Sequence, residues 1–318
     1  MKIKVKRHLE IMMLVSDWLQ GQTLNADETG CSLSYEFDRL PYADLVVFER
    51  SADHNWMYKQ KPEQIWTRLI LESPSNRSPD DNYDWEYDYR SNVILPSPYG
   101  MYLSYEKPEC LTSPEIMDDI QNGNWTLDYL PEDFQSKADE ATALISNTRS
   151  ANNRLEIIEE LKRYFPVRMY GPTFTSCPNH HADCKQYLGS RFKFYLAFEN
   201  SNCREYITEK FFFNALNYNM IPIVLGAPLE DYRKIAPPHS FVHVESFKSI
   251  EDLAHYLHEI ASNPMLASKF FAWKRFGFLY GNPSGPVRLC SLLQYSLNRG
   301  EIPSNYHVDK LSDGVCNV

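Results

Sequence analysis

Short apolar runs separated by polar loops mark the first part of the chain. Glu10–Val15, Ala43–Phe48 and Arg68–Leu71 are apolar runs of strand length, and each is predicted to be a buried strand. The stretch Ser73–Tyr89 is rich in Pro, Ser, Asn and Asp, so it is predicted to be a long surface loop. The polar stretch Thr112–Glu140 is the predicted domain boundary.

The hydrophobic pattern changes after that boundary, where strands alternate with helices. The helix predicted for Asn153–Phe165 places its apolar residues on one face. A second helix is predicted to begin after Ser249, a suitable N-cap residue, and to end at Asn263-Pro264. Strands are predicted at Ala143–Ile145, Val167–Tyr170, Phe192–Phe198, Ile221–Leu225 and Phe241–Val244. Such alternation indicates a parallel, Rossmann-like sheet, here without the usual Gly-rich fingerprint.

Size and charge narrow the possible partners. A chain of 318 residues exceeds what one hydrophobic core usually supports, so two domains are predicted. The net charge of −10 offers no basic stripe for neutralising phosphates, which argues against a nucleic-acid partner. Aromatic residues make up 14% of the chain, a share that suits sugar-binding clefts and aromatic cores equally. Any phosphate-bearing ligand must therefore be held by a local group of side chains.

No segment reaches the roughly 18–20 consecutive apolar residues that a membrane span requires. The opening residues Met1–Arg7 are basic, but the apolar run that follows is too short for a signal sequence. We expect the chain to be either the catalytic portion of a protein or a form without its targeting segment. Seven cysteines and two N-glycosylation triplets, at Asn76 and Asn124, favour an oxidising lumen.

Two of the cysteines enclose the segment Cys177-Pro-Asn-His-His-Ala-Asp-Cys184. Its two thiols and two imidazoles could form a tetrahedral zinc site. A disulfide between Cys177 and Cys184 is the favoured interpretation in a lumenal protein, and two unpaired thiols are the remaining alternative.

The most informative segment follows the strand predicted for Phe192–Phe198. Polar residues Glu199–Ser201 come directly after this strand, and a helix is predicted to open near Thr208. Ligands of open α/β sheets gather at the carboxyl ends of strands, and a helix N-terminus there attracts an anion. Lys210 adds a positive charge, and Glu209 could bind both hydroxyls of a ribose. The segment has the chemistry of a nucleotide-diphosphate site, although a plain turn with a surface Glu-Lys pair would have the same composition.

The amino-acid sequence of this segment resembles the signature of the α1,3/4-fucosyltransferase family. The similarity rests on Glu199-Asn-Ser201, on Tyr206-Ile-Thr-Glu-Lys210 and on Ile221-Pro-Ile-Val-Leu-Gly226. It extends over nearly all of residues 140–290, including Ile145-Ser-Asn147 with Arg154, and the helix before Asn263.

The N-terminal half resembles the same family more thinly, but in the right order. Trp66…Glu72-Ser-Pro74 is similar to the family's "W…ESP" element, and Trp85…Pro98-Tyr-Gly100 to a later one. Three features depart from the family pattern: Asp84 where Asn is usual, Ser91–Ile94 in place of a charged run, and Glu49-Arg50 where histidines often stand. All three bear on the identity of the acceptor.

The resemblance implies a GT-B-type α/β fold, with two Rossmann-like lobes facing a central cleft. We expect an acceptor-binding lobe at residues 1–135, a GDP-fucose-binding lobe at 136–290 and a C-terminal extension at 291–318. Arg154, Tyr206 and Lys210 would hold the diphosphate of the donor. Glu209 would hold the ribose, Asn200 would border the donor site, and Glu72 would be the general base.

By this resemblance the protein is an inverting α1,3-fucosyltransferase of the Golgi lumen, with membrane attachment only through a segment absent from this chain. GDP-fucose is the expected donor, and a glycan with terminal or internal GlcNAc is the expected acceptor. The acceptor class stays open among Lewis-type, LacdiNAc and N-glycan core structures. No Asp-x-Asp motif accompanies the nucleotide segment, so no metal or cofactor is expected to be required, and a divalent cation at most to stimulate.

Two alternatives stay open. One is a catalytically inactive homologue that binds a glycan or nucleotide, and the other is a transferase for a different nucleotide sugar. The first would be expected to lose members of the set Glu72, Arg154, Glu209 and Lys210, all of which are present. The sequence Tyr206-Ile-Thr-Glu-Lys210 disfavours a transferase for a different nucleotide sugar.

Overall fold

The computed structural model describes residues 8–15, 22–49, 61–73, 83–105, 126–178, 180–281, 285–299 and 316–317. Asn76 and Asn124 of the two glycosylation triplets and the basic opening residues lie outside these ranges. The chain divides into two compact units: Met1–Pro98 with Asn282–Val315, and Tyr99–Gly281 with Cys316–Val318. The two units of α/β structure agree with the prediction of two domains.

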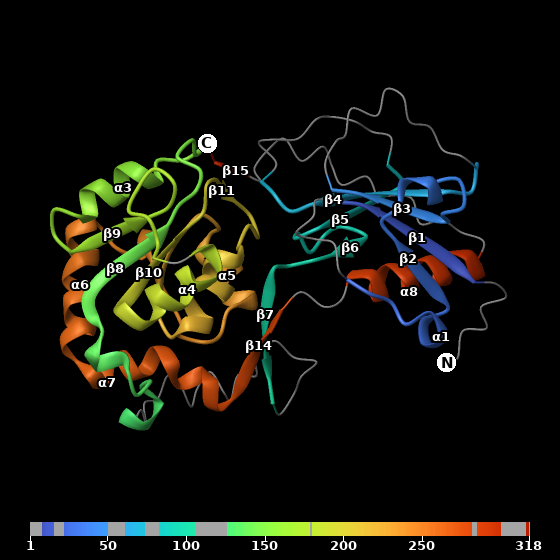
Figure 1. Cartoon of the computed structure of the whole chain (residues 1–318). Helices are drawn as coiled ribbons and strands as arrows, with labels where there is room; N and C mark the ends of the chain where they lie inside the picture. Colours follow the sequence, from blue (N-terminus) through green and yellow to red (C-terminus); the bar gives the residue numbers. More distant parts are fainter. Residues whose placement is uncertain are drawn as a thin grey trace. The chain divides into compact units, whose positions relative to one another are not determined.

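Unit 1 contains a six-stranded sheet in the order β2-β1-β3-β4-β5-β6 (Figure 1). All neighbouring strands are parallel. The strands are β1 (Leu9–Leu14), β2 (Cys31–Ser34), β3 (Leu45–Phe48), β4 (Ile65–Ile70), β5 (Trp85–Asp88) and β6 (Leu95–Pro96), and the helices are α1 (Ala26–Thr29) and α8 (Gly285–Arg299). The three strands predicted in this region are therefore present.

The prediction of a surface loop over Ser73–Tyr89 is wrong for its last part, which forms β5. Trp85 and Tyr87 are buried in the core of unit 1, together with Leu69 of β4. Asp88 is fully buried and accepts a 2.7 Å hydrogen bond from Nε of Arg90. The polar composition suggested a loop, but the segment also contains two aromatic side chains that are buried in the core and an aspartate that is paired with an arginine.

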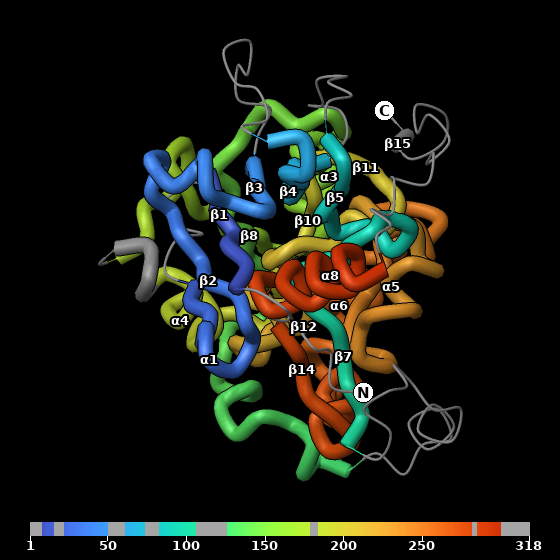
Figure 2. The backbone as a smooth tube through the Cα atoms, turned by 90° about the vertical axis from the view of Figure 1, so that its right-hand side faces the viewer, coloured from blue at the N-terminus to red at the C-terminus, as the bar shows by residue number. Residues whose placement is uncertain are grey.

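Helix α8 returns the C-terminal part of the chain to unit 1, where it packs with the N-terminal strands (Figures 1 and 2). Leu289 and Leu293 of α8 share a core with Leu9 and Ile11 of β1. A disulfide between Cys31 and Cys290 joins β2 to α8 across a sequence separation of 259 residues. The structure therefore divides the chain differently from the predicted boundary near residue 135, since α8 packs with β1 and residues 99–135 belong to unit 2.

Unit 2 contains a five-stranded parallel sheet in the order β13-β12-β10-β8-β9. Its strands are β8 (Ala138–Leu144), β9 (Val167–Tyr170), β10 (Phe192–Phe198), β12 (Ile221–Leu225) and β13 (Val242–His243). Its helices are α3 (Arg154–Leu161), α4 (His180–Arg191), α5 (Leu229–Ile235), α6 (Ile250–Ser262) and α7 (Pro264–Ser268), with a 3₁₀ segment at Lys269–Arg275. These elements match the alternation read from the sequence, down to the N-cap of α6, where the Ser249 side chain accepts from the Asp252 N–H.

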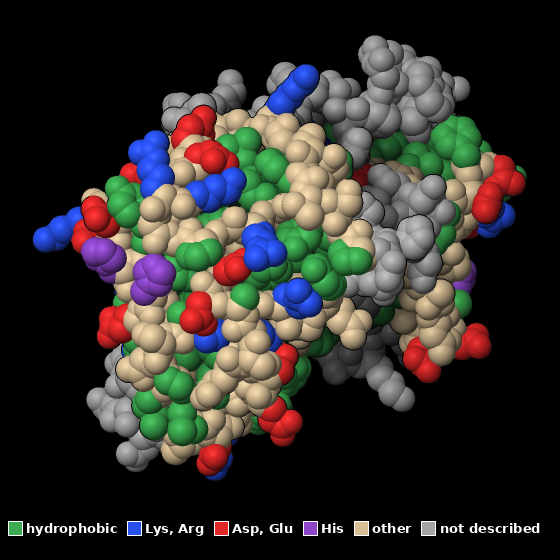
Figure 3. Space-filling view, turned by 60° about the vertical axis from the view of Figure 1, so that its left-hand side comes forward, with side chains coloured by type: hydrophobic (Ala, Val, Ile, Leu, Met, Phe, Trp, Pro, Cys, Tyr) green, Lys and Arg blue, Asp and Glu red, His purple; other side chains and the backbone are tan. Residues whose placement is uncertain are grey.

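Strand β10 lies in the middle of this sheet and is buried on both faces, which explains its unbroken apolar sequence. Leu196 and Phe198 face a core that α3 and α6 complete, whereas Tyr195 and Ala197 face a second core with residues of α4 and α5. The helices therefore cover both faces of the sheet, as Figure 1 shows. The surface of unit 2 visible in Figure 3 carries interspersed acidic and basic side chains.

Two further pairs of strands complete unit 2. β7 (Gly100–Ser104) and β14 (Gly277–Gly281) form an antiparallel ribbon and lie side by side in Figures 1 and 2. The Tyr102 hydroxyl donates a 3.0 Å hydrogen bond to the Trp273 carbonyl and so fixes this ribbon to the unit. β11 (Asn202–Cys203) pairs with β15 (Cys316–Asn317). Within the described part of the chain, no helix combines the length and hydrophobicity needed to cross a bilayer.

Candidate functional site

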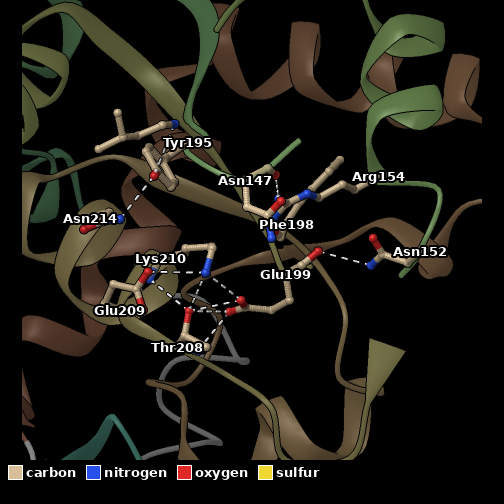
Figure 4. A network of polar contacts seen from close by, with 11 residues as sticks. Asn147, Asn152, Arg154, Tyr195, Phe198, Glu199, Thr208, Glu209, Lys210 and Asn214 are labelled. Atoms are coloured by element: carbon tan, nitrogen blue, oxygen red, sulfur yellow. Dashed lines mark hydrogen bonds and ion pairs between the residues drawn. The ribbon is translucent and has the colours of Figure 1, made fainter. Parts of the chain in front are cut away.

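The candidate site lies at the carboxyl edge of the unit 2 sheet, where β10 ends at Phe198. Glu199 follows this strand directly and is fully buried. The chain then runs through β11 and returns at Thr208, whose backbone N–H donates to the Glu199 carboxylate at 2.9 Å. A helical segment, Lys210–Ala215, begins immediately afterwards (Figure 4). The sequence therefore brings a buried acid and the start of a helix to the edge at which α/β folds bind ligands.

The ammonium group of Lys210 is surrounded by three oxygen acceptors (Figure 4). It donates to Oε2 of Glu199 at 2.9 Å, to the Thr208 hydroxyl at 3.0 Å and to Oε1 of Glu209 at 3.3 Å. Burial alone would lower the pKa of Lys210, but the two carboxylates outweigh it and hold this pKa above its ordinary value. Lys210 is therefore cationic across the physiological pH range.

The two carboxylates beside Lys210 differ in exposure. The Glu199 side chain is 0% exposed, whereas the Glu209 side chain is 41% exposed. Burial raises the pKa of Glu199, and the Lys210 charge opposes this shift only in part. Burial also acts to raise the pKa of Glu209, but Lys210 and hydrogen bonds to the carboxylate hold it below its usual value. Glu209 is thus an ionised and accessible acceptor, as binding to ribose hydroxyls would require.

Arg154 is the first residue of α3, and its side chain points to the end of β10 (Figure 4). It is 2% exposed and donates to the Phe198 carbonyl at 3.0 Å and to the Asn147 carbonyl. Its Nε has no hydrogen-bond partner among the described residues. Burial lowers the pKa of Arg154, and nearby Glu199 and Tyr206 counteract the shift. The structure therefore places a buried cation at the base of the loop that follows β10.

The loop over residues 199–208 also holds Asn200 and Tyr206, the two other predicted donor-site residues. The Asn200 carbonyl accepts from the Ala151 N–H at 2.8 Å, so the loop is tied to the segment before α3. Tyr206 is 1% exposed, and its N–H donates to the Cys203 carbonyl at 3.3 Å. All five predicted donor-site residues therefore belong to one edge of one sheet.

A second buried acid, which the sequence reading missed, holds the far side of the same loop. Asp231 of α5 is 1% exposed and accepts two hydrogen bonds from Arg204, at 2.7 and 2.8 Å, and one from the Glu205 N–H at 2.8 Å. Glu205 has a φ of 59°, in the left-handed region that a non-glycine residue rarely adopts. The Asp231 carboxylate pairs with Arg204 and also accepts from the Glu205 N–H, and these contacts stabilise that conformation.

The helix predicted to open near Thr208 begins as a π-helix over Lys210–Ala215. Such wide turns are frequent at functional sites. The Asn214 amide donates to the buried Tyr195 hydroxyl at 3.2 Å, which links this turn to β10. Side-chain periodicity cannot distinguish a π-turn of this length from an α-helix, so the π-turn could not be predicted from the sequence.

Glu72, the predicted general base, lies in unit 1, two residues beyond the end of β4. Its side chain is exposed, whereas Ser73 after it is buried. The expected position at the carboxyl end of a strand is thus observed. The expectation that Glu72 faces Lys210 and Glu209 across a cleft remains a prediction.

The Cys177-to-Cys184 segment forms a disulfide, as predicted, so its two thiols are not ligands of a zinc ion. Cys203 in the loop after β10 is also disulfide-bonded. Among the residues that the structure describes, no cluster of three or more His, Cys, Asp or Glu side chains is arranged to hold a metal ion.

Comparison with known proteins agrees with the resemblance seen in the sequence. Residues 134–303 match the family model for the C-terminal part of glycosyltransferase family 10 (fucosyltransferase). The chain is 33% identical over 256 residues to glycoprotein 3-alpha-L-fucosyltransferase A of Drosophila melanogaster, covering 78% of this chain and 47% of the relative. It is 32% identical over 255 residues to alpha-(1,3)-fucosyltransferase 7 of Rattus norvegicus, covering 77% of this chain and 61% of the relative. The chain thus spans about half to three fifths of these relatives.

The fold agrees with that of a solved α1,3-fucosyltransferase with GDP-fucose. The TM-score is 0.55 at 19% sequence identity, and the match covers 93% of this chain and 92% of the other. With two units built on parallel sheets covered by helices, the predicted GT-B-type α/β fold is confirmed. The chain belongs to glycosyltransferase family 10, the fucosyltransferases.

Proposed function

We propose that this protein transfers L-fucose from GDP-fucose in α1,3 linkage to a GlcNAc-type residue of a glycan, with inversion at the anomeric carbon. The observation that carries the proposal is the Lys210 network at the carboxyl edge of the unit 2 sheet. It combines a permanent cation and an accessible carboxylate with the start of a helix. The names of the relatives and the GDP-fucose in a protein of the same fold support this choice of donor.

Each residue of the site has a role that follows from its chemistry. Lys210 binds the diphosphate with a charge-assisted contact, and Tyr206 and Arg154 complete this side of the donor site. Glu209 accepts from the ribose hydroxyls, and Asn200 borders the donor. Because both phosphates leave as part of GDP, stabilisation of their developing charge lowers the barrier to breaking the bond to fucose.

Glu72 is the proposed general base. It removes the proton of the acceptor hydroxyl as that oxygen attacks the anomeric carbon, while GDP departs from the opposite face. The transition state resembles an oxocarbenium ion, and the product has the α configuration. One carboxylate is sufficient because the leaving group needs no proton. A Golgi lumen is the compartment in which we place the reaction, in keeping with the disulfides of the chain.

A GDP-release assay tests this function. The protein is incubated with GDP-fucose alone, with GDP-fucose and N-acetyllactosamine, LacdiNAc or an N-glycan core, and with GDP-mannose in place of GDP-fucose. We expect GDP release that depends on both GDP-fucose and one of the acceptors. Binding of GDP-fucose without release in the presence of any acceptor would instead support a binding homologue, and release with GDP-mannose would indicate a different donor.

A further inference from the structure

A fully buried carboxylate supports the lysine that the proposed function places at the donor phosphates. Glu199 directly follows the central strand β10, and its backbone N–H donates to the Leu225 carbonyl of β12 at 2.8 Å. The backbone of Glu199 is therefore tied to the neighbouring strand at the centre of the unit 2 sheet. Isolated acids are rarely fully buried, because ionisation in an apolar environment is costly without a partner.

The space for this side chain is provided by a glycine on the neighbouring strand end. A Cβ added to Gly226 would lie 2.7 Å from Cβ and 2.9 Å from Cγ of Glu199. Gly226 also has a φ of +143°, which side chains other than hydrogen seldom tolerate. The end of β12 is thus shaped to admit the Glu199 stem.

The Glu199 carboxylate contacts both Thr208, which precedes the π-helix, and Lys210, the first residue of that helix (Figure 4). It accepts from the Thr208 N–H at 2.9 Å, from the Thr208 hydroxyl at 2.8 Å and from the Lys210 ammonium at 2.9 Å. Because the Thr208 hydroxyl donates to Glu199, its lone pairs remain to accept from Lys210 at 3.0 Å. Carboxylate, hydroxyl and ammonium therefore form one closed network.

We propose that Glu199 is a positioning residue, which fixes the Lys210 ammonium and the Thr208–Lys210 turn for contact with the donor diphosphate. The proposal rests on the proposed function, in which Lys210 binds that diphosphate. The most exposed of the three acceptors, Glu209, also makes the longest contact, at 3.3 Å. Arrival of the donor exchanges this contact for a phosphate oxygen and frees Glu209 for the ribose, while Glu199 and Thr208 keep Lys210 in place.

A purely structural role would be served better by other side chains. Replacing a buried ion pair with apolar residues of similar volume is often neutral or stabilising. Glu199 instead contacts the lysine that is proposed to bind the phosphates. Loss of Glu199 should therefore weaken the binding of ligands with a phosphate more than the binding of ligands without one. This difference distinguishes positioning from packing.

The test compares the affinities of GDP and guanosine by calorimetry in the wild type, Glu199→Gln, Thr208→Val and Lys210→Ala proteins. Guanosine lacks the diphosphate, so the ratio of the two affinities isolates recognition of the phosphates. In Glu199→Gln, the side-chain NH₂ must face either the Lys210 ammonium or the Thr208 N–H, both of which are donors. We therefore expect the ratio of GDP affinity to guanosine affinity to fall about tenfold or more. Thr208→Val leaves the Glu199–Lys210 pair and removes the hydroxyl, and a fall of several-fold is expected.

Thr142→Val is the matched control for the threonine variant. Thr142 is fully buried in β8, and its hydroxyl donates to the Arg168 carbonyl at 3.0 Å, away from the Lys210 network. Thr142→Val should lose about as much stability as Thr208→Val, whereas its ratio of GDP affinity to guanosine affinity should equal that of the wild type. A double variant, Glu199→Gln with Lys210→Ala, should have the same ratio as Lys210→Ala alone, because Glu199 acts through Lys210.

The outcomes separate the two proposals. A ratio that Lys210→Ala leaves unchanged would refute the diphosphate assignment of Lys210. A ratio that falls in Lys210→Ala but not in Glu199→Gln or Thr208→Val would refute the positioning role alone. Equal weakening of GDP and guanosine by Glu199→Gln would reduce Glu199 to a structural residue, and if this variant does not fold, the Thr208→Val and Thr142→Val pair decides.

Discussion

Replacement of Lys210 by alanine should affect both stability and donor binding, and the structure allows the two effects to be estimated separately. The variant removes the ammonium that is paired with the fully buried Glu199. Removal of one partner of a buried ion pair costs about 3–5 kcal/mol. Since the Lys210 side chain is 18% exposed, water can partly replace it, and we expect a loss near the lower end.

The effect on binding follows from the lost phosphate contact. A hydrogen bond between a charged group and a phosphate contributes about 1.5–3 kcal/mol. This corresponds to a loss of GDP affinity of about 10- to 150-fold. Guanosine, which carries no phosphate, should bind the folded variant nearly as well as the wild type.

Thermal unfolding and calorimetry at a temperature where every variant is folded separate these effects. Adding Glu199→Gln to Lys210→Ala should recover part of the stability, because no buried carboxylate is left without a cation. It should recover none of the GDP affinity. A folded Lys210→Ala protein that is as stable as the wild type and unchanged in its affinity for GDP would refute both roles assigned to Lys210.

Three further predictions concern the rest of the site and the fold. Glu72→Gln should slow turnover by about 10²–10⁴-fold through loss of the general base, with GDP affinity nearly unchanged; full turnover in steady-state kinetics would remove Glu72 from the mechanism. Activity should survive EDTA, at most reduced, and complete loss that only manganese restores would contradict this. Burial and the nearby Lys269 charge lower the pKa of His239 from 6.5 to about 4. Because the unfolded chain then binds more protons between these values, stability should fall as pH drops from about 6.5 towards 4. His239→Asn, which suits the left-handed φ of 56° at this position, should weaken that dependence in thermal unfolding, and an unchanged slope would contradict the assignment.

The elements of unit 2 were predictable because their signals are local. β9, β10 and β12 have the bounds predicted from their apolar runs, and the N-cap of α6 is a short-range pattern. β5 was missed because the acidic and amide residues around Trp85 and Tyr87 suggest a loop. Trp85 and Tyr87 are buried in a core with residues of β1, β4 and α8, and this tertiary packing is not visible in the local sequence.

The candidate site, too, was predictable only where its signals are local in the sequence. The residues after β10 could be located from the sequence, since a strand end followed by a helix start defines the ligand-binding edge. The partners of Lys210 could not, because the Glu199 contact spans a loop that returns to the strand end. The return of α8 to unit 1 likewise depends on a disulfide and a core between the two ends of the chain.

Transfer of labelled fucose from GDP-fucose to a panel of glycan acceptors measures the proposed activity itself. The panel contains N-acetyllactosamine, LacdiNAc and N-glycan core acceptors, and product linkage is determined by nuclear magnetic resonance. We expect labelled fucose in α linkage at O3 of a GlcNAc-type residue in at least one acceptor. A folded protein that binds GDP-fucose but labels none of them, or that forms a β-linked product, would contradict it.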